Sequence, residues 1–197
     1  MKLYDMELSG NAYKIRLFCS LLGLHCESVP VDLTKQEHKH ADFLALNPRG
    51  QVPVLDDGGT IVWDSMAILV YLARKYADHR WLPTEAEAMA RVMQWLALSE
   101  NEILYGLARA RAVKRFKRPW DLAQCQELGR SALSVMENHL QHEQWLAADW
   151  PTIADIACYP YVALAPEGGI ALDDYPHVRQ WLARIRSLPG YVGMPGL

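Results

Sequence analysis

Short apolar runs alternate with helical patterns over residues 1–77. Runs of apolar or alternating residues predict strands, and apolar residues spaced three and four apart predict helices. The predicted strands are Lys2–Met6, Cys26–Val31, Val52–Leu55 and Ile61–Trp63. The predicted helices are Tyr13–Leu22, Asp42–Leu46 and Ser65–Tyr76. Because Asp56-Asp57-Gly58-Gly59 indicates a hairpin turn, the predicted order is β-α-β-α-β-β-α, an α/β unit.

The pattern changes after residue 84, where amphipathic helices follow one another without a convincing strand. Apolar stripes begin at Met89, Leu128 and Val178. Thr152-Ile153-Ala154-Asp155 fits a capping box, which predicts a buried helix over Ile153–Ala165. The sequence therefore predicts an N-terminal domain over residues 1–77, a linker over 78–84 and an all-helical domain over 85–197.

Composition narrows the functional classes. The 197 residues carry 20 Lys+Arg and 23 Asp+Glu, a net charge of −3, which disfavours binding to nucleic acid or to a membrane surface. A hydrophobic content of 51% predicts packed cores. The chain shows neither a long apolar span nor a signal-like start, so we expect a cytoplasmic protein without a membrane partner. The cysteines, predicted to be buried thiols without metal-ligand spacing, are Cys19, Cys26, Cys125 and Cys158.

Two predicted helix starts carry polar groups suited to a charged ligand. At Ser9-Gly10-Asn11, Ser9 or Asn11 would cap the first helix, and a serine hydroxyl there can also donate a hydrogen bond to a thiolate. At Asp64-Ser65, Ser65 is expected to be the N-cap of the next helix. The free N–H groups of that helix favour a carboxylate, and Asp64 favours an ammonium group.

These segments, in this order, resemble the cytosolic glutathione S-transferase superfamily, and in particular its bacterial-type, serine-containing members. The first motif is Asn47-Pro48-Arg49-Gly50-Gln51-Val52-Pro53-Val54-Leu55, and the second is Trp63-Asp64-Ser65-Met66-Ala67-Ile68-Leu69-Val70-Tyr71-Leu72. The late capping box, Thr152 to Ile156, is the third. The resemblance covers nearly the whole chain.

The resemblance implies a thioredoxin-like N-terminal domain, a helical-bundle C-terminal domain and glutathione as co-substrate, without a metal. Pro53 would follow a cis peptide bond. The positions that match the family's glutathione-binding residues are His38, Gln51, Val52, Pro53, Asp64 and Ser65. The positions that match its thiolate-stabilising hydroxyl, and are therefore assigned as catalytic, are Ser9 and Asn11. Tyr4 lies within the first strand and Cys19 inside the first helix, so neither is preferred for that role.

The implied activity is transfer of glutathione to small electrophiles, with a role in detoxification. The alternatives left open are a non-catalytic ligand carrier or interaction module, and a glutathione-dependent isomerase, dehalogenase or peroxide reductase. The family implies a homodimer, for which Trp63, Trp81 and Trp95 are candidate interface residues. The basic run Arg109–Arg118 is interpreted as a solvated face or a mobile helix end, with a second hypothesis that it favours anionic electrophiles. The tail Gly190–Leu197 is expected to be mobile or to cover the site.

Overall fold

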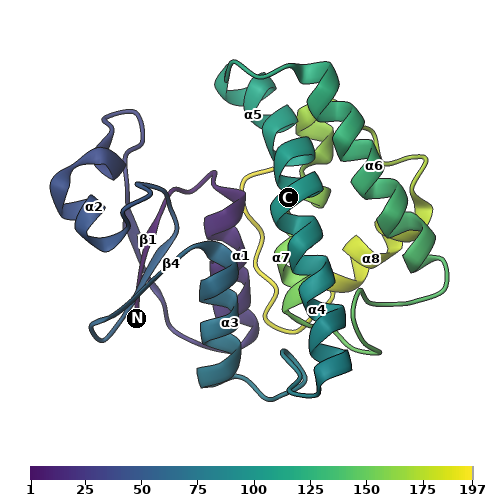
Figure 1. The fold of residues 1–197 in the computed structure, drawn as a ribbon, viewed down its shortest axis with the longest axis horizontal. Coiled ribbons are helices and arrows are strands. Elements are labelled where there is room, and N and C mark those ends of the chain that lie inside the picture. The colour runs from purple at the N-terminus through teal and green to yellow at the C-terminus, as the bar shows by residue number, and fades with distance from the viewer. Residues whose placement is uncertain (197) are drawn as a thin grey trace.

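The computed structural model describes residues 1–196, and Leu197 lies outside the described residues. Its N-terminal part is built on a four-stranded sheet (Figure 1). The strands, in the spatial order β2-β1-β3-β4, are β1 (Lys2–Asp5), β2 (Glu27–Pro30), β3 (Val54–Asp57) and β4 (Thr60–Trp63). Strand β1 pairs in parallel with β2 and antiparallel with β3, and β3 pairs antiparallel with β4. The glycines of the predicted hairpin turn, Gly58 and Gly59, both have positive φ.

Helices cover both faces of this sheet. Helices α1 (Gly10–Leu21) and α3 (Ser65–Tyr76) lie between the sheet and the helical domain, and α2 (Ala41–Leu46), preceded by the short helix η1 (Glu37–Lys39), lies on the other side (Figure 1). A small apolar cluster of Val31, Phe43 and Val54 packs on the α2 side. The larger core continues from the α1 side into the helical domain. This is the predicted thioredoxin-like arrangement followed by a helical domain.

A long rod of three consecutive segments forms the front of the helical domain (Figure 1). The segments are α4 (Ala86–Leu98), the π-helical η2 (Ser99–Ala108) and α5 (Arg109–Phe116). The remaining helices are α6 (Leu122–Leu140), α7 (Ile153–Ala163), η3 (Ala165–Gly168) and α8 (Pro176–Arg186). At the crossing of η2 with α6, a Cβ atom on Gly106 would collide with the main chain of Gly129. These two glycines therefore allow η2 and α6 to approach closely.

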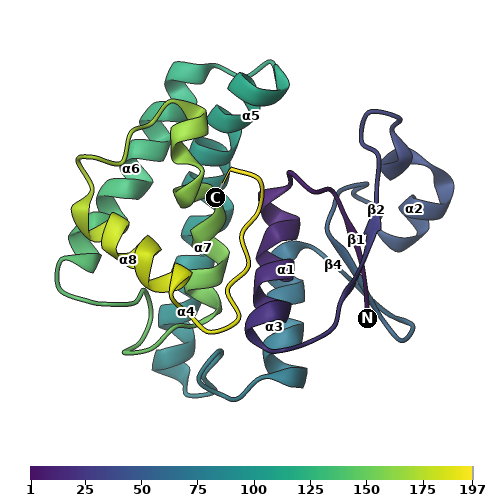
Figure 2. The ribbon, with the colours of Figure 1, turned by 180° about the vertical axis from the view of Figure 1, so that it is seen from behind.

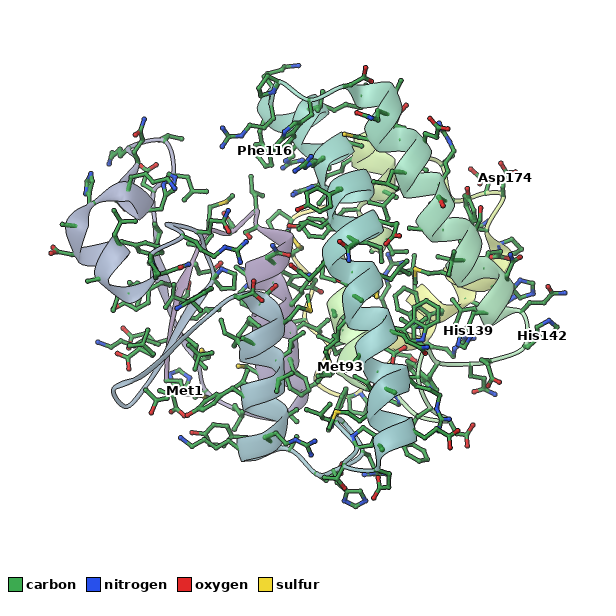
Figure 3. The ribbon with its side chains drawn as sticks, viewed as in Figure 1. Met1, Met93, Phe116, His139, His142 and Asp174 are labelled. Carbon is green, nitrogen blue, oxygen red and sulfur yellow. The ribbon has the colours of Figure 1, made fainter. Side chains whose placement is uncertain are left out.

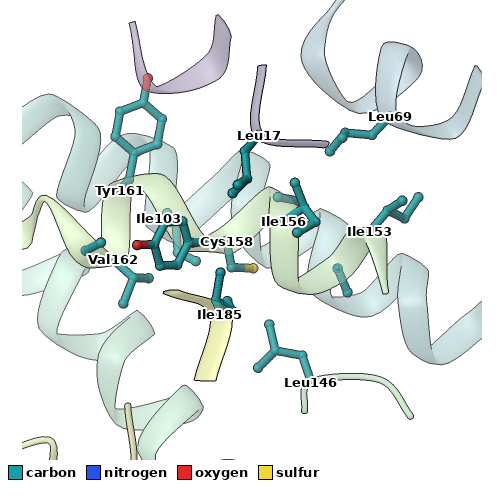
Figure 4. Close-up of a cluster of buried hydrophobic side chains, with 14 of the residues drawn as sticks. Leu17, Leu69, Ile103, Leu146, Ile153, Ile156, Cys158, Tyr161, Val162 and Ile185 are labelled. Carbon is teal, nitrogen blue, oxygen red and sulfur yellow. The ribbon is translucent and has the colours of Figure 1, made fainter. Parts of the chain in front are cut away.

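Helix α7 is buried along its whole length and begins at the predicted capping box. The Thr152 N–H donates to the Asp155 carboxylate at 2.9 Å, and the Thr152 hydroxyl accepts from the Ala154 N–H at 3.2 Å. Asp155 is fully buried and also accepts from Trp181 Nε1 at 2.9 Å and from the Leu146 N–H at 3.1 Å. Side chains of α7 fill the centre of the core with residues from α1, η2 and α8 (Figure 4).

The last described residues lie along the back of α1, between it and α7 (Figure 2). The Ser20 hydroxyl donates to the Gly190 carbonyl at 2.7 Å, and the Tyr13 hydroxyl donates to the Val192 carbonyl at 2.6 Å. The hydroxyls of Tyr191 and Tyr159 are 2.8 Å apart. Residues 190–196 therefore link the two domains on this side.

Several element boundaries differ from the predicted ones. Helix α1 begins at Gly10 rather than Tyr13, because the Ser9 side chain accepts from the Ala12 N–H and caps the helix earlier. Strand β3 begins at Val54 rather than Val52, since Pro53 has no N–H to give to the ladder. Helix α7 ends at Ala163, before the short helix η3.

Candidate active site

The starts of α1 and α3 meet the turn before β3 in a small cleft. Its lining residues are Asn11, Asn47, Arg49, Gln51, Val52, Pro53, Asp64 and Ser65. Six of the eight residues predicted from the sequence lie in this lining, from segments far apart in the chain. Ser9 lies one residue before α1, and His38 lies in η1, away from the cleft lining.

At the start of α1, Ser9 is the N-cap. Its Oγ accepts from the Ala12 N–H at 3.2 Å, so its hydroxyl proton remains available for donation. The first turn of α1 holds no acidic side chain, so the positive end of the helix dipole is not neutralised from within the helix. A negatively charged sulfur beside Ser9 would be stabilised by both groups.

At the start of α3 the N-cap is Asp64, which corrects the prediction that Ser65 caps this helix. Asp64 Oδ1 accepts from the Met66 N–H at 2.9 Å, and Oδ2 pairs with Arg49 Nη1 at 2.9 Å. Ser65 is the first helical residue and is 3% exposed. Asp64 also has φ of 78°, a left-handed conformation that costs free energy in a residue other than glycine. This backbone conformation is typical of residues held in place for binding.

The turn between α2 and β3 is braced by buried Asn47. Asn47 Nδ2 donates to the Gln51 carbonyl at 2.7 Å, and its Oδ1 accepts from the Arg49 N–H at 3.0 Å. The Val52–Pro53 peptide bond is cis, as the resemblance implies. Val52 takes no part in the ladder pairs of β3, which leaves its main chain at the edge of the cleft.

His38 is half-buried and is not among the residues that line the cleft. Burial lowers the pKa of His38, and the charges of Lys39, Arg118 and His40 lower it further, which favours the neutral imidazole. The next residue reaches the turn instead: Lys39 Nζ donates to the Gly50 carbonyl at 2.9 Å.

Three residues around the cleft were not predicted from the sequence as site residues: Asn47, Arg49 and Lys39. Asn47 and Arg49 belong to the first motif, Asn47 to Leu55. The only indication of the ion pair in the sequence is that Arg49 and Asp64, which carry opposite charges, lie in the two neighbouring motifs. The bracing by Asn47 depends on how the turn folds back, which no spacing in the sequence reveals.

An ion pair between buried Lys14 and half-buried Glu100 connects the two domains. Lys14, in α1, is completely buried, with Nζ 3.4 Å from Ser99 Oγ and 3.9 Å from Glu100 Oε1. Burial lowers the pKa of Lys14 to about 8, opposed by the charge of Glu100, and burial raises the pKa of Glu100. The charge of Asp64 acts on both groups, so this pair influences the electrostatics at the start of α3.

The basic run is only partly a solvated face, which corrects the sequence interpretation. Arg111 is 3% exposed, with Nε 2.6 Å from Glu167 Oε2 and Nη1 donating to the Leu8 carbonyl at 2.9 Å. Arg115 pairs with the other oxygen of Glu167 at 3.1 Å. Figure 3 shows Phe116 near the end of α5 that faces the N-terminal domain, and its ring lies 5.5 Å from the Arg111 guanidinium. Arg111 therefore joins α5 to the residue that precedes Ser9.

Metal-ligating and membrane-spanning features are both absent from residues 1–196. These residues contain no cluster of three or more His, Cys, Asp or Glu side chains arranged to hold a metal ion. No helix in this part of the chain is long and apolar enough to cross a bilayer. Its four cysteines are all free, with Cys19, Cys125 and Cys158 buried and Cys26 half-buried.

Comparison with protein families gives matches to both domains. Residues 1–74 match the glutathione S-transferase N-terminal domain, and residues 103–189 match the glutathione S-transferase C-terminal domain. Glutathione S-transferase 3 of Zea mays is 36% identical over 97% of this chain and 91% of the maize protein. The maleylacetoacetate isomerase of Pseudomonas aeruginosa is 33% identical over 91% of this chain and 88% of the isomerase.

Solved structures show the same similarity. A crystal structure of a glutathione S-transferase from Pseudomonas fluorescens superimposes with a TM-score of 0.92. The two chains are 36% identical, and the match covers 98% of each. The similarity therefore spans both domains and the junction between them.

Proposed function

The chain belongs to the glutathione S-transferase family and is a glutathione transferase, and from this premise we propose that it binds glutathione in the cleft and catalyses attack of the glutathione thiolate on small electrophiles. The observation that carries the proposal is the cleft itself. It joins two helix N-termini, a carboxylate at Asp64 and main chain at Val52 that lies outside the strand pairs. Those are the groups needed to hold a small peptide with charged ends and a central thiol.

Each part of glutathione has a counterpart in the cleft. The γ-glutamyl carboxylate would accept from the free N–H groups at the start of α3 and from the Ser65 hydroxyl. Its ammonium group would lie near Asp64. The cysteinyl part would pair with the Val52 main chain, next to the cis peptide bond. The glycyl carboxylate would lie towards Gln51 and His38.

Catalysis would depend on the sulfur beside Ser9. A hydrogen bond from the Ser9 hydroxyl and the dipole of α1 stabilise the thiolate, so the thiol loses its proton to solvent at a lower pH than free cysteine. Asn11, in the cleft lining, would assist from the same turn. The sulfur then forms a bond to an electrophilic carbon that is held against the helical domain. The reaction is fast because glutathione and the electrophile are bound next to each other.

Two measurements test this proposal. Calorimetry should detect binding of reduced glutathione at millimolar concentration. Ser9→Ala should lower kcat by about 100-fold while changing the glutathione KM less than threefold, because the hydroxyl acts on the sulfur rather than on the charged ends. Asn11→Ala is the matched variant. If Ser9→Ala kept full turnover and Asn11→Ala lost it, the catalytic role would belong to Asn11.

We also propose that the protein is a cytoplasmic homodimer that acts in detoxification. Large apolar side chains are exposed at Ile61 and Trp63 on β4 and at Met93 on α4, and Met93 is labelled in Figure 3. Trp81 and Trp95, named with Trp63 from the sequence, instead pack against Phe18 and His139. Light scattering should give twice the mass of the chain, and Trp63→Arg should shift it towards one copy.

A glutathione-dependent isomerase is the second candidate, favoured by the similarity to the Pseudomonas aeruginosa isomerase. Isomerisation would use the same glutathione cleft and would differ in the electrophile pocket. Parallel assays of cis–trans isomerisation of an unsaturated diketo acid and of conjugation to an aryl halide separate the two. Binding of glutathione without either activity would support a ligand carrier.

A further inference from the structure

The side chain of Tyr161 reaches from the helical domain to the start of α1. Tyr161 lies on α7 and is 8% exposed. Its ring packs against Gly10, where a Cβ atom would lie 2.6 Å from Cε1 and 2.7 Å from Cζ. Because Cζ carries the hydroxyl, the oxygen lies beside the first turn of α1. In Figure 4 the Tyr161 oxygen is directed out of the apolar cluster, towards the purple ribbon of the N-terminal segment.

The hydroxyl of Tyr161 is available as a hydrogen-bond donor. The Asn11 N–H acts on this oxygen and lowers the pKa of Tyr161, while the hydroxyl keeps its own proton for another acceptor. Burial raises the pKa of Tyr161 to about 12, and the nearby Arg111 charge opposes this rise. The hydroxyl is therefore protonated at neutral pH. The neighbouring Tyr159 differs, because its hydroxyl lies 2.8 Å from Tyr191 Oη and accepts from Arg186 Nε at 3.2 Å.

Gly10 lies between Ser9 and Asn11, the two residues assigned to the sulfur. A second buried polar atom points to a ligand at the same turn, since Asn11 Oδ1 has no hydrogen-bond partner within the described residues. A sulfur held against the Ser9 hydroxyl would lie at this helix start, next to the Tyr161 hydroxyl. No residue of the helical domain was assigned to the sulfur from the sequence.

We infer that the Tyr161 hydroxyl donates a second hydrogen bond to the sulfur of bound glutathione, so that the two domains share the stabilisation of the thiolate. This inference rests on the proposed function. The thiol proton leaves to the buffer and Tyr161 keeps its own. The sulfur lone pair then forms the carbon–sulfur bond, and the displaced electron pair leaves with the leaving group or moves into the electrophile.

The test uses the full-length protein with Tyr161→Phe, which keeps the ring over Gly10 and removes only the oxygen. Tyr159→Phe is the matched control, because it removes a hydroxyl from the same helix that is bonded elsewhere. Charged groups near Tyr161 are Arg111 on α5, Lys14 on α1 and Glu100 on η2, and all are retained in both variants. The readout is the ultraviolet absorbance of the glutathione thiolate, titrated with pH in the complex.

For Tyr161→Phe we expect the pKa of the bound thiol to rise by about one unit, which is the effect of losing one hydrogen bond to a charged acceptor. At pH 6.5 kcat/KM should fall about tenfold, with the dissociation constant of glutathione changed less than threefold at low pH, where the thiol is neutral. The Tyr159→Phe variant should titrate as the parent does.

Three outcomes are distinguishable. An unchanged thiol pKa in Tyr161→Phe, with glutathione still bound, would overturn the inference and leave the proposed function standing. A rate loss confined to one class of electrophile, without a change in thiol pKa, would also overturn it, because Tyr161 would then contact the electrophile. Failure of the parent protein to bind glutathione would instead refute the proposed function.

Discussion

Replacing Arg111 should weaken both the domain junction and catalysis. Arg111 is almost fully buried, binds Glu167 through Nε and holds the Leu8 carbonyl through Nη1, and Leu8 directly precedes Ser9. Arg111→Met keeps an unbranched side chain of similar length and removes the guanidinium. The matched variant is Arg115→Met, since Arg115 also pairs with Glu167, on the same helix, but its side chain is 38% exposed.

The expected loss of stability follows from the hydrogen bond and the ion pair that Arg111→Met removes. Leaving the Leu8 carbonyl without its charged donor costs about 1.5–3 kcal/mol. Glu167 keeps its ion pair with Arg115 and is 20% exposed, so losing its ion pair with Arg111 costs about 1 kcal/mol. Arg111 Nη2 is buried without a partner within the described residues, so removing this nitrogen relieves a desolvation penalty and offsets part of the loss of stability. Arg111→Met should therefore lose about 3 kcal/mol of unfolding free energy, and Arg115→Met about 0.5 kcal/mol.

Urea unfolding followed by tryptophan fluorescence measures the loss of stability, and steady-state kinetics without urea measures the loss of catalytic activity. The hydrogen bond from Arg111 to the Leu8 carbonyl holds the main chain next to Ser9 in position. We therefore expect kcat of Arg111→Met to fall about tenfold under conditions in which the variant is fully folded. Equal, small losses of stability in both arginine variants, with unchanged kcat in each, would refute the role given to Arg111.

Two further predictions concern buried and partly buried carboxylates. Asp155→Ala leaves the buried donors of Leu146, Thr152 and Trp181 without an acceptor and should cost about 4 kcal/mol, seen as a lower Tm in calorimetry, whereas Ser134→Ala should not change it. Hydrogen bonds led by that from Lys75 lower the pKa of Asp57 to about 2. Ionised Asp57 contributes fully to the stability of the fold above its unfolded-state pKa of about 4, and this contribution is lost as the pH falls towards 2. The unfolding midpoint of Asp57→Asn should therefore depend less on pH between pH 6 and pH 3 than that of the parent protein.

Much of the fold could be predicted because local chemistry and tertiary packing agree. The hairpin glycines adopt the positive φ that their turn requires, and the Thr152–Asp155 box begins a buried helix as its spacing indicates. The start of α3 could not be assigned correctly. Both Asp64 and Ser65 are good capping residues, and the choice between them depends on the backbone at Asp64 and its pairing with Arg49.

Less of the candidate site than of the fold could be predicted from the sequence. The predicted cleft residues come from short motifs, so their proximity follows once the motifs occupy one edge of the domain. Arg111 and Tyr161 lie in the helical domain, and they approach the start of α1 only through packing between domains. A charge run and an apolar helix give no sign in the sequence of which side chain crosses that junction.

The hydrogen bonds from Ser20 to Gly190 and from Tyr13 to Val192 have a consequence for biosynthesis. A ribosome makes the first helix early and the segment after residue 189 much later, so the back of that helix stays without this partner while the intervening residues are synthesised. The N-terminal domain can therefore reach its finished packing only after residues 190–192 have left the ribosome, and a polypeptide stalled before residue 190 would expose the uncovered face of the first helix to chaperones and proteases.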